Sequence, residues 1–349
     1  MTSHTEFGSR TDGSTVSASF PSSVKDKVFI ITGVSTNGLG QATADALATQ
    51  EPRRLILTGR SKVKVQQVID HLAPRFPKTT FQMLLMDLSS IESVRQAAQE
   101  IMATCELDAI DCVICNAGVM SIPYRQLSKD GIEMHFATNH IGHFLFVNLI
   151  MEKIIAAGGA SSEGGARIVN LSSLAHMNSP IRFSDYNLEK SESDLPTDER
   201  PNVEAMKKLG LPHGGIYNEY IAYGQSKTAN CLYSLALNTR LNARNVRSYA
   251  VHPGVVMTDL FRHSDQIFKE QMANLTKTAG VEVKTREQGC ATSLVAALDP
   301  ALLTPDEKGS HLYLSDCQFT ETLPWARDSA AADRLWALSE TLVNQKFGW

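Results

Sequence analysis

The stretch Lys27-Val-Phe-Ile-Ile-Thr-Gly-Val-Ser-Thr-Asn-Gly-Leu-Gly40 decides the fold. Its first half is a continuous apolar run, as expected for a strand that is buried on both faces of a sheet. Its second half is rich in glycine, and Gln41 to Thr49 then follow a helical pattern. Strand, glycine-rich turn and helix together present backbone N–H groups and a helix N-terminus to a pyrophosphate. An ordinary tight turn that binds no ligand is the alternative interpretation.

Similar apolar runs recur along the chain and alternate with helical patterns. The predicted strands cover seven segments: 27–32, 53–58, 81–86, 110–115, 167–171, 246–251 and 310–314. This alternation predicts an α/β fold, a doubly wound parallel seven-stranded sheet (Rossmann fold) with helices on both faces, in a single domain over residues 25–349. Two long irregular segments, 174–219 and 256–284, are predicted to be substrate loops.

The composition excludes several classes of protein. The chain has 349 residues, 43% of them hydrophobic, and a net charge of -4, which gives no footprint for nucleic acid or an anionic membrane surface. No apolar run approaches the roughly 20 residues that a membrane span needs. Residues 1–24 are polar and lack a signal sequence, so we expect a disordered polar tail there. The six cysteines suggest no disulfide framework, which favours a reduced, cytoplasmic location.

Two pairs of potential metal ligands occur inside predicted elements. Cys112 and Cys115 lie in one predicted strand, where side chains at these positions point to opposite faces. His140 and His143 lie three residues apart in a helical pattern, without a third ligand at a suitable spacing. Packing in the core is the preferred interpretation of both pairs, so no metal is predicted.

The residues that directly follow the predicted strands carry the chemistry. In parallel sheets ligands bind beyond the carboxyl ends of the strands, so these residues should share one edge. They are Gly33, Arg60, Asp87, Asn116, Ser173 and Pro253. At the end of the second strand an acid would bind a ribose 2′-hydroxyl, whereas a base accommodates a 2′-phosphate. Arg60 stands there, which favours NADP(H) over NAD(H); a solvated helix start is the alternative.

Tyr223 and Lys227 lie four residues apart in a long helical pattern, one turn apart on the same face. A nearby ammonium favours the phenolate, so we expect Lys227 to lower the pKa of Tyr223 and make it a usable proton donor and acceptor. Tyr186 and Lys190 share this spacing, and Tyr186 lies 13 residues after Ser173. No apolar stripe follows Tyr186, so Tyr223 is preferred and Tyr186 remains the alternative.

These residues together resemble the short-chain dehydrogenase/reductase family, over roughly residues 25 to 345. The runs Thr138-Asn-His-Ile-Gly-His143, Val169-Asn-Leu-Ser-Ser-Leu-Ala175 and His252-Pro-Gly-Val255 are similar to those of its retinol-dehydrogenase-like branch. The resemblance implies four catalytic residues. Tyr223 would be the proton donor, Lys227 would bind the nicotinamide ribose, Ser173 would bond the substrate oxygen, and Asn139 would hold a water in the proton relay.

The resemblance also implies a cofactor site. Its residues would be Gly33, Ser35, Gly38, Leu39, Gly40, Arg60, Asp87, Leu88, Asn116, Ala117, Gly118, Tyr223, Lys227, Pro253, Gly254, Val256 and Thr258. The chain departs from the family at two points. Gly33 and Gly38 enclose four residues instead of the usual three, and the interval from Ser173 to Tyr223 is unusually long.

The predicted function is therefore an NADP(H)-dependent oxidoreductase that interconverts a ketone or aldehyde and an alcohol on a small, lipophilic substrate. Two alternatives remain open: an epimerase or dehydratase that uses the same Ser/Tyr/Lys group, and a non-catalytic dinucleotide sensor or scaffold. Relatives often pair through the helix that carries the tyrosine, so a homodimer is an open alternative to a monomer.

Overall fold

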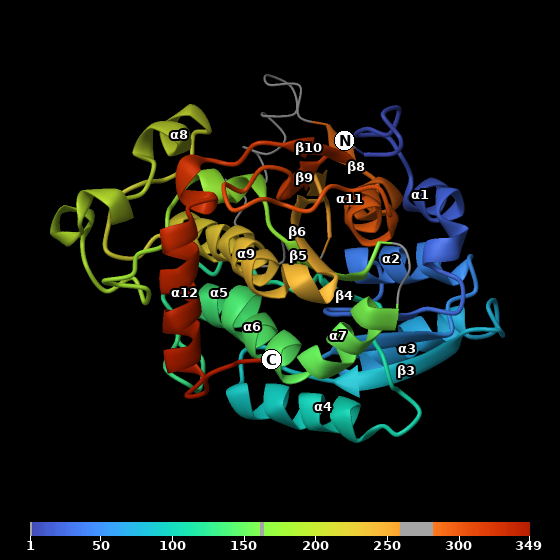
Figure 1. Cartoon of the computed structure of the whole chain (residues 1–349). Helices are drawn as coiled ribbons and strands as arrows, with labels where there is room; N and C mark the ends of the chain where they lie inside the picture. Colours follow the sequence, from blue (N-terminus) through green and yellow to red (C-terminus); the bar gives the residue numbers. More distant parts are fainter. Residues whose placement is uncertain (1, 161–163, 259–281) are drawn as a thin grey trace.

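A computed structural model describes residues 2–160, 164–258 and 282–349 (Figure 1). Its centre is an eight-stranded sheet in the order β10-β9-β6-β5-β4-β1-β2-β3. The strands are β1 (Val28–Ile31), β2 (Arg54–Gly59), β3 (Thr80–Leu85), β4 (Cys112–Cys115), β5 (Ala166–Leu171), β6 (Val246–His252), β9 (Tyr313–Ser315) and β10 (Gln318–Thr320). All but β10 run parallel, which confirms the predicted doubly wound α/β sheet and single domain.

The eighth strand, β10, was not predicted from the sequence. It pairs antiparallel with β9 through the turn residues Asp316 and Cys317, whose φ angles are 48° and 63°. Two successive positive φ angles are typical of the tight hairpin turns that match the twist of paired strands. The sequence offers no glycine at this turn, and three residues are too few for an alternating pattern, so nothing marked the hairpin.

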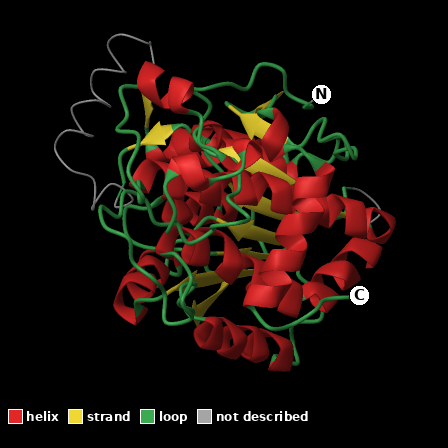
Figure 2. Cartoon of the chain, turned by 90° about the vertical axis from the view of Figure 1, so that its left-hand side faces the viewer, coloured by secondary structure: helices red, strands yellow, loops and turns green. Residues whose placement is uncertain are grey.

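Helices cover both faces of the sheet (Figures 1 and 2). One face carries α2 (Leu39–Ala48), α3 (Lys62–Leu72) and α11 (Arg286–Leu298), and the other carries α4 (Ile91–Ala103), α6 (Gly142–Leu149), α7 (Met151–Ala160) and α9 (Glu219–Leu241). Outside α9 lies α12 (Ser329–Leu342). Because α9 is enclosed between the sheet and α12, most of its residues are buried all round.

Cys112 and Cys115, considered above as a possible pair of metal ligands, lie on opposite faces of the sheet. Cys112 packs in the cluster beneath α2 and α11, whereas Cys115 packs in the cluster beneath α4 and α6. Both thiols are free and buried. Their side chains therefore lie on opposite faces of β4, and the interpretation as core residues is confirmed.

The prediction of a disordered tail over residues 1–24 is wrong. Helix α1 (Gly13–Ser19) packs against α2 and α11, and Phe7, Val16, Phe20 and Val24 are buried. The polar residues also find partners: the Gln318 side chain donates to the carbonyls of His4 and Phe7, at 2.9 and 2.8 Å. Four widely spaced apolar residues form no stripe, so only their contacts with distant helices show that the segment folds.

The first predicted substrate loop, 174–219, is well structured. It contains short helical turns, including η3 (Leu174–Met177), and the helix α8 (Val203–Lys208). A buried ion pair between Arg182 and Asp185 holds its middle, and Glu199 accepts from the backbone and side chain of Ser184, at 2.9 and 2.6 Å. Of the second loop, 256–284, residues 259–281 lie outside the described residues.

Among the described residues, no single helix is long and apolar enough to cross a bilayer. The pair Met134–Leu149 and Met151–Ala160, bent by 63°, meets the test of length and composition only when taken together.

The order of the N-terminal segment can be tested by mutation. Replacing Phe20 with alanine should lower the free energy of unfolding by about 3 kcal/mol, because it removes a large buried side chain. Thr15→Ala, on the exposed side of α1, is the matched control and should change stability by less than about 0.5 kcal/mol. Denaturant unfolding measures both; equal stability of Phe20→Ala and the parent protein would contradict the packed arrangement.

Candidate active site

Helix α9 carries Tyr223 and Lys227 into the carboxyl edge of the sheet. Tyr223 lines a cavity there together with Ser173, which directly follows Ser172 after β5, and the Ser173 side chain lies close enough to lower the pKa of the Tyr223 phenol. Lys227 lies one turn further along, with Nζ 5.4 Å from the centre of the Tyr223 ring. The same Nζ donates to the Leu171 carbonyl at 2.8 Å. Serine, tyrosine and lysine thus meet as the sequence predicted.

The electrostatics of this group differ from the expectation. Burial raises the pKa of the Tyr223 phenol above its ordinary value, and the Ser173 side chain offsets only part of this rise. Burial also lowers the pKa of Lys227, to about 8. The expectation that Lys227 lowers the tyrosine pKa is not met, because the cost of removing a phenolate from water dominates.

Asn139 lies in a π-helical turn, η2 (Ala137–Ile141), that joins α5 (Met134–Phe136) to α6. Such turns occur frequently at functional sites. The side chain accepts from the Val119 backbone N–H at 2.8 Å and donates to the Val119 carbonyl at 3.0 Å. It also donates to Ser226 on α9, at 2.9 Å. Asn139 therefore links the segment after β4 to α9.

The glycine-rich turn after β1 is fixed by the segment after β4. Gly33 has φ +71°, and a Cβ there would lie 2.6 Å from the Cα of Ala117, so only glycine fits. The Asn116 side chain donates to the carbonyls of Thr32 and Gly33, at 2.7 and 3.3 Å. The additional residue of the turn is accommodated at Asn37, which has φ 62°. Gly38 is then the N-cap of α2 and places no side chain over its first N–H groups.

The other predicted cofactor residues lie along the same edge. Arg60 is exposed directly after β2, and Asp87 follows β3, where it accepts from the N–H and hydroxyl of Ser89, at 3.0 and 2.7 Å. Leu88 instead packs in the core against Gly142. A Cβ on Gly118 would lie 3.3 Å from Asn139 Oδ1 and 3.7 Å from Lys227 Nζ, so this glycine keeps the space beside Lys227 open. These features fit a bound dinucleotide.

The segment after β6 closes the far side of the site. Gly254 has φ +85°, and a Cβ there would lie 2.6 Å from the side chain of Lys284. Lys284 belongs to β8 (Val283–Lys284), which pairs with β7 (Val255–Val256), and its Nζ lies 2.5 Å from Asp316. The ion pair therefore holds Pro253 to Val256 in place.

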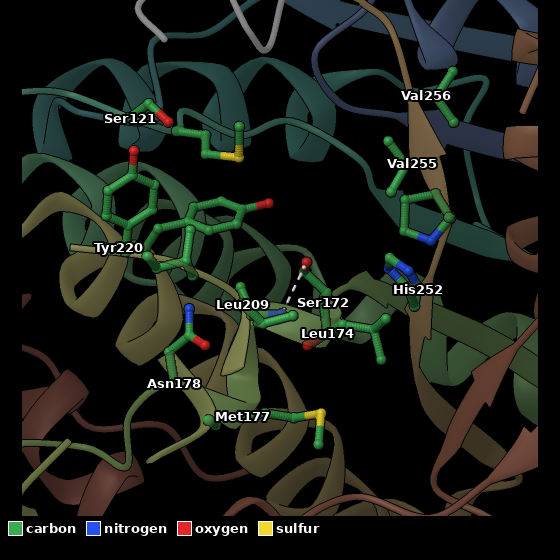
Figure 3. A pocket seen from close by; sticks show the side chains of 18 of the residues that line it. Ser121, Ser172, Leu174, Met177, Asn178, Leu209, Tyr220, His252, Val255 and Val256 are labelled. Atoms are coloured by element: carbon green, nitrogen blue, oxygen red, sulfur yellow. Dashed lines mark hydrogen bonds between the residues drawn. The ribbon is translucent and has the colours of Figure 1, made fainter. Parts of the chain in front are cut away.

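A cavity of about 420 Å³ opens beside Ser173 and Tyr223 (Figure 3). Of the predicted site residues it is lined by Leu39, Ser173, Tyr223, Pro253, Gly254, Val256 and Thr258. Nine further lining residues come from segment 174–219, which the sequence predicted to be a substrate loop: Leu174, Ala175, Met177, Asn178, Ala205, Lys208, Leu209, Leu211 and Glu219. Sequence reasoning missed Met120, Ser121, Ser172, Tyr220 and His252, and Val255 lies between the predicted residues Gly254 and Val256. Most of the lining residues are apolar. Burial lowers the pKa of His252 to about 4, so this histidine is neutral at pH 7.

The cavity does not bring all predicted residues together. Gly38 borders a second hollow of about 270 Å³ between the first turns of α2 and α11. Ser35 lies in the glycine-rich turn, and its carbonyl accepts from the Gly38 N–H at 3.0 Å. Gly33, Gly40, Arg60, Asp87, Asn116, Ala117, Gly118, Asn139 and Lys227 lie outside the cavity lining.

The competing tyrosine has a structural role. Tyr186 packs against Phe136, with ring centres 6.1 Å apart, and it does not line the cavity. Lys190 donates to the Ser184 carbonyl at 3.0 Å. The structure therefore favours Tyr223 over Tyr186 as the proton donor.

The histidine pair also belongs to the core. His143 Nε2 lies 2.8 Å from Thr32 Oγ1, and His140 Nε2 lies 2.8 Å from Ser339 Oγ. Burial lowers the pKa of both rings, to about 4 for His143 and about 3 for His140. Within the described ranges no group of three or more His, Cys, Asp or Glu side chains could hold a metal ion.

The sequence is similar to those of known short-chain dehydrogenases. The sequence profile described as short chain dehydrogenase matches residues 27–191. Retinol dehydrogenase 12 of Homo sapiens is 34% identical over 91% of this chain and 86% of its own length. The chloroplastic short-chain dehydrogenase TIC 32 A of Brassica napus is 36% identical over 90% of this chain and 88% of its own length.

Solved structures agree on the fold. An uncharacterized protein from Mycobacterium paratuberculosis has a TM-score of 0.66 and 26% identity, over 95% of this chain and 98% of its own. The NADPH-bound carbonyl reductase from chicken fatty liver has a TM-score of 0.56 and 18% sequence identity, over 84% of this chain and 97% of its own. Because a relative that is 34% identical matches 91% of this chain, the chain belongs to the short-chain dehydrogenase/reductase family and is similar to its retinol dehydrogenases.

Proposed function

We propose that the protein is an NADP(H)-dependent oxidoreductase that interconverts a ketone or aldehyde and an alcohol, with Tyr223 as the general acid and base. The observation that carries this proposal is that Ser173 and Tyr223 line the same largely apolar cavity, with Lys227 Nζ 5.4 Å from the centre of the Tyr223 ring. Two hydroxyl groups at the wall of one cavity can both bond a single carbonyl oxygen placed between them. The apolar lining favours a lipophilic substrate.

The residues divide the chemistry as follows. When bound, the dinucleotide would supply or accept the hydride. Ser173 orients the carbonyl oxygen, and the Tyr223 hydroxyl gives it a proton during reduction or takes the proton back during oxidation. The buried Lys227 ammonium lies close enough to stabilise a transient phenolate, because charge interactions strengthen away from water. The apolar walls exclude water from this exchange.

The preference for NADP(H) rests on the charge of the residues that follow β2. Arg60 is exposed at the position where a 2′-phosphate would lie, and the segment from Gly59 to Lys62 contains no acid. Two structures with this fold, the chicken carbonyl reductase and the L-sorbose reductase of Gluconobacter frateurii, are described as NADPH complexes.

Removal of the Tyr223 hydroxyl tests the mechanism. Tyr223→Phe should lower kcat for the reduction of a lipophilic ketone by about 10²–10⁴-fold, since positioned acid catalysis contributes that much. NADPH binding, followed by fluorescence titration, should change little. Tyr186→Phe is the matched control and should keep near-normal turnover. The assignment fails if Tyr223→Phe stays active, and tight NADPH binding by a parent protein without turnover would favour the sensor alternative.

Removal of the Arg60 charge tests the cofactor preference. Arg60→Ala should weaken NADPH binding by roughly 10- to 100-fold and leave NADH binding nearly unchanged, because a hydrogen bond to a charged group contributes about 1.5–3 kcal/mol. Arg53→Ala, exposed directly before β2 at the other end of the strand, is the matched control. Titration of each variant with both dinucleotides measures the effect; parallel losses for NADPH and NADH would contradict the proposal.

The pKa of Lys227 gives a dependence on pH. The ammonium is present below the folded-state pKa of about 8 and is lost as the pH rises through it. The value of kcat/KM for NADPH reports the free enzyme, so it should fall on the alkaline side with an apparent pKa near 8. Lys227→Arg should shift that fall to higher pH, because a guanidinium stays charged. An unchanged alkaline limb in Lys227→Arg would assign the titration to another group.

A further inference from the structure

Ser121 lines the cavity and combines a buried, unpaired hydroxyl with a strained backbone. It lies in the segment after β4, and only 1% of its surface is exposed. Its Oγ is buried and has no hydrogen-bond partner among the described residues. Leaving a buried hydroxyl unpaired typically costs about 1–3 kcal/mol, so such groups generally have a partner in the working state of a protein.

The backbone at Ser121 is also strained. Its φ is 53°, in the left-handed region that residues with a Cβ avoid. Strain of this kind persists only where the surroundings impose it, and it concentrates at functional sites. A glycine at position 121 would relieve the strain, so the presence of serine points to a use for the side chain.

Hydrogen bonds on both sides of Ser121 impose this conformation. On one side Val119 is bonded twice to the Asn139 side chain, as described above. On the other side the Ile122 carbonyl accepts from the Tyr217 hydroxyl at 2.9 Å, and the Ile122 N–H donates to His135 Nε2 at 3.5 Å. His135 is oriented in turn by the buried Glu133 carboxylate, 2.8 Å from its Nδ1. The hydroxyl is thus held at a fixed place.

That place borders the substrate cavity. In the view of Figure 3, Ser121 lies on the same side of the cavity as Tyr220 and across from His252 and Val255. The reacting oxygen would bond Ser173 and Tyr223, so it does not need Ser121. A second oxygen on the substrate can supply the partner that Ser121 lacks.

We propose that Ser121 determines substrate specificity, and that preferred substrates carry a second oxygen, a hydroxyl or carbonyl group, on an otherwise apolar skeleton remote from the reacting carbonyl. The inference rests on the carbonyl reduction proposed above. A site that bonds a substrate hydroxyl discriminates strongly against the analogue without it, because the protein group is then left unpaired. Ser121 is therefore a specificity residue and takes no part in proton transfer.

The test compares 2-decanone with five derivatives that carry one hydroxyl, at C5, C6, C7, C8 or C9. NADPH oxidation gives kcat/KM for each ketone. We expect the parent protein to prefer at least one derivative over 2-decanone by about tenfold or more. Ser121→Ala should reduce that preference to less than about twofold.

Two further variants separate recognition from structure. Ser17→Ala removes another buried hydroxyl without a partner, in α1 and outside the cavity lining, so it should keep the preference. Ser121→Gly should lose the preference and raise the melting temperature, because it relieves the strained φ. A preference that survives in Ser121→Ala would overturn the inference alone, as would a parent protein that reduces all six ketones equally. No reduction of any of the six would instead overturn the proposed function.

Discussion

The site depends on the joint between the end of β5 and the middle of α9. The Leu171 carbonyl accepts from Lys227 Nζ and from the Asn230 side chain, both at 2.8 Å, and the Ser172 hydroxyl donates to the Lys227 carbonyl at 2.8 Å. These bonds fix the position of α9 along its axis relative to the end of β5. Ser173 and Tyr223 consequently meet, although 49 residues separate them in the sequence. A buried lysine costs solvation, and this carbonyl supplies part of the compensation.

The sequence predicted the sheet well because its signals are local. Continuous apolar runs, the glycine turn and the residues after each strand mark a doubly wound fold without any knowledge of tertiary contacts. The same logic placed Gly33, Asn116 and Ser173 at one edge. What failed were features that depend on distant partners. The helix α1 is stabilised by α2 and α11, and β10 exists because two non-glycine residues adopt positive φ.

The sequence predicted that the segment containing Leu209 and Leu211 contributes to the substrate site, but not which of its residues reach the cavity. That depends on the turn at the end of α8, which no periodic pattern marks. Ser121 carried a usable signal: it follows Asn116-Ala-Gly118 at the edge where ligands bind. Its strained φ and its unpaired hydroxyl, however, follow from the bonds around Val119 and Ile122, which are visible only in three dimensions.

The segment from Asn116 to Ile122 connects the two halves of the site. At its start, Asn116 fixes the glycine-rich turn and Gly118 leaves space beside Lys227. At its end, Ser121 forms part of the cavity wall. Between them Val119 is held by Asn139, whose amide also bonds Ser226 on the catalytic helix. A shift of this short segment would therefore disturb the dinucleotide turn, the lysine and the substrate wall together. Asn139 is buried and bonds both Val119 in this segment and Ser226 on α9. Its side chain therefore holds the segment at a fixed distance from α9.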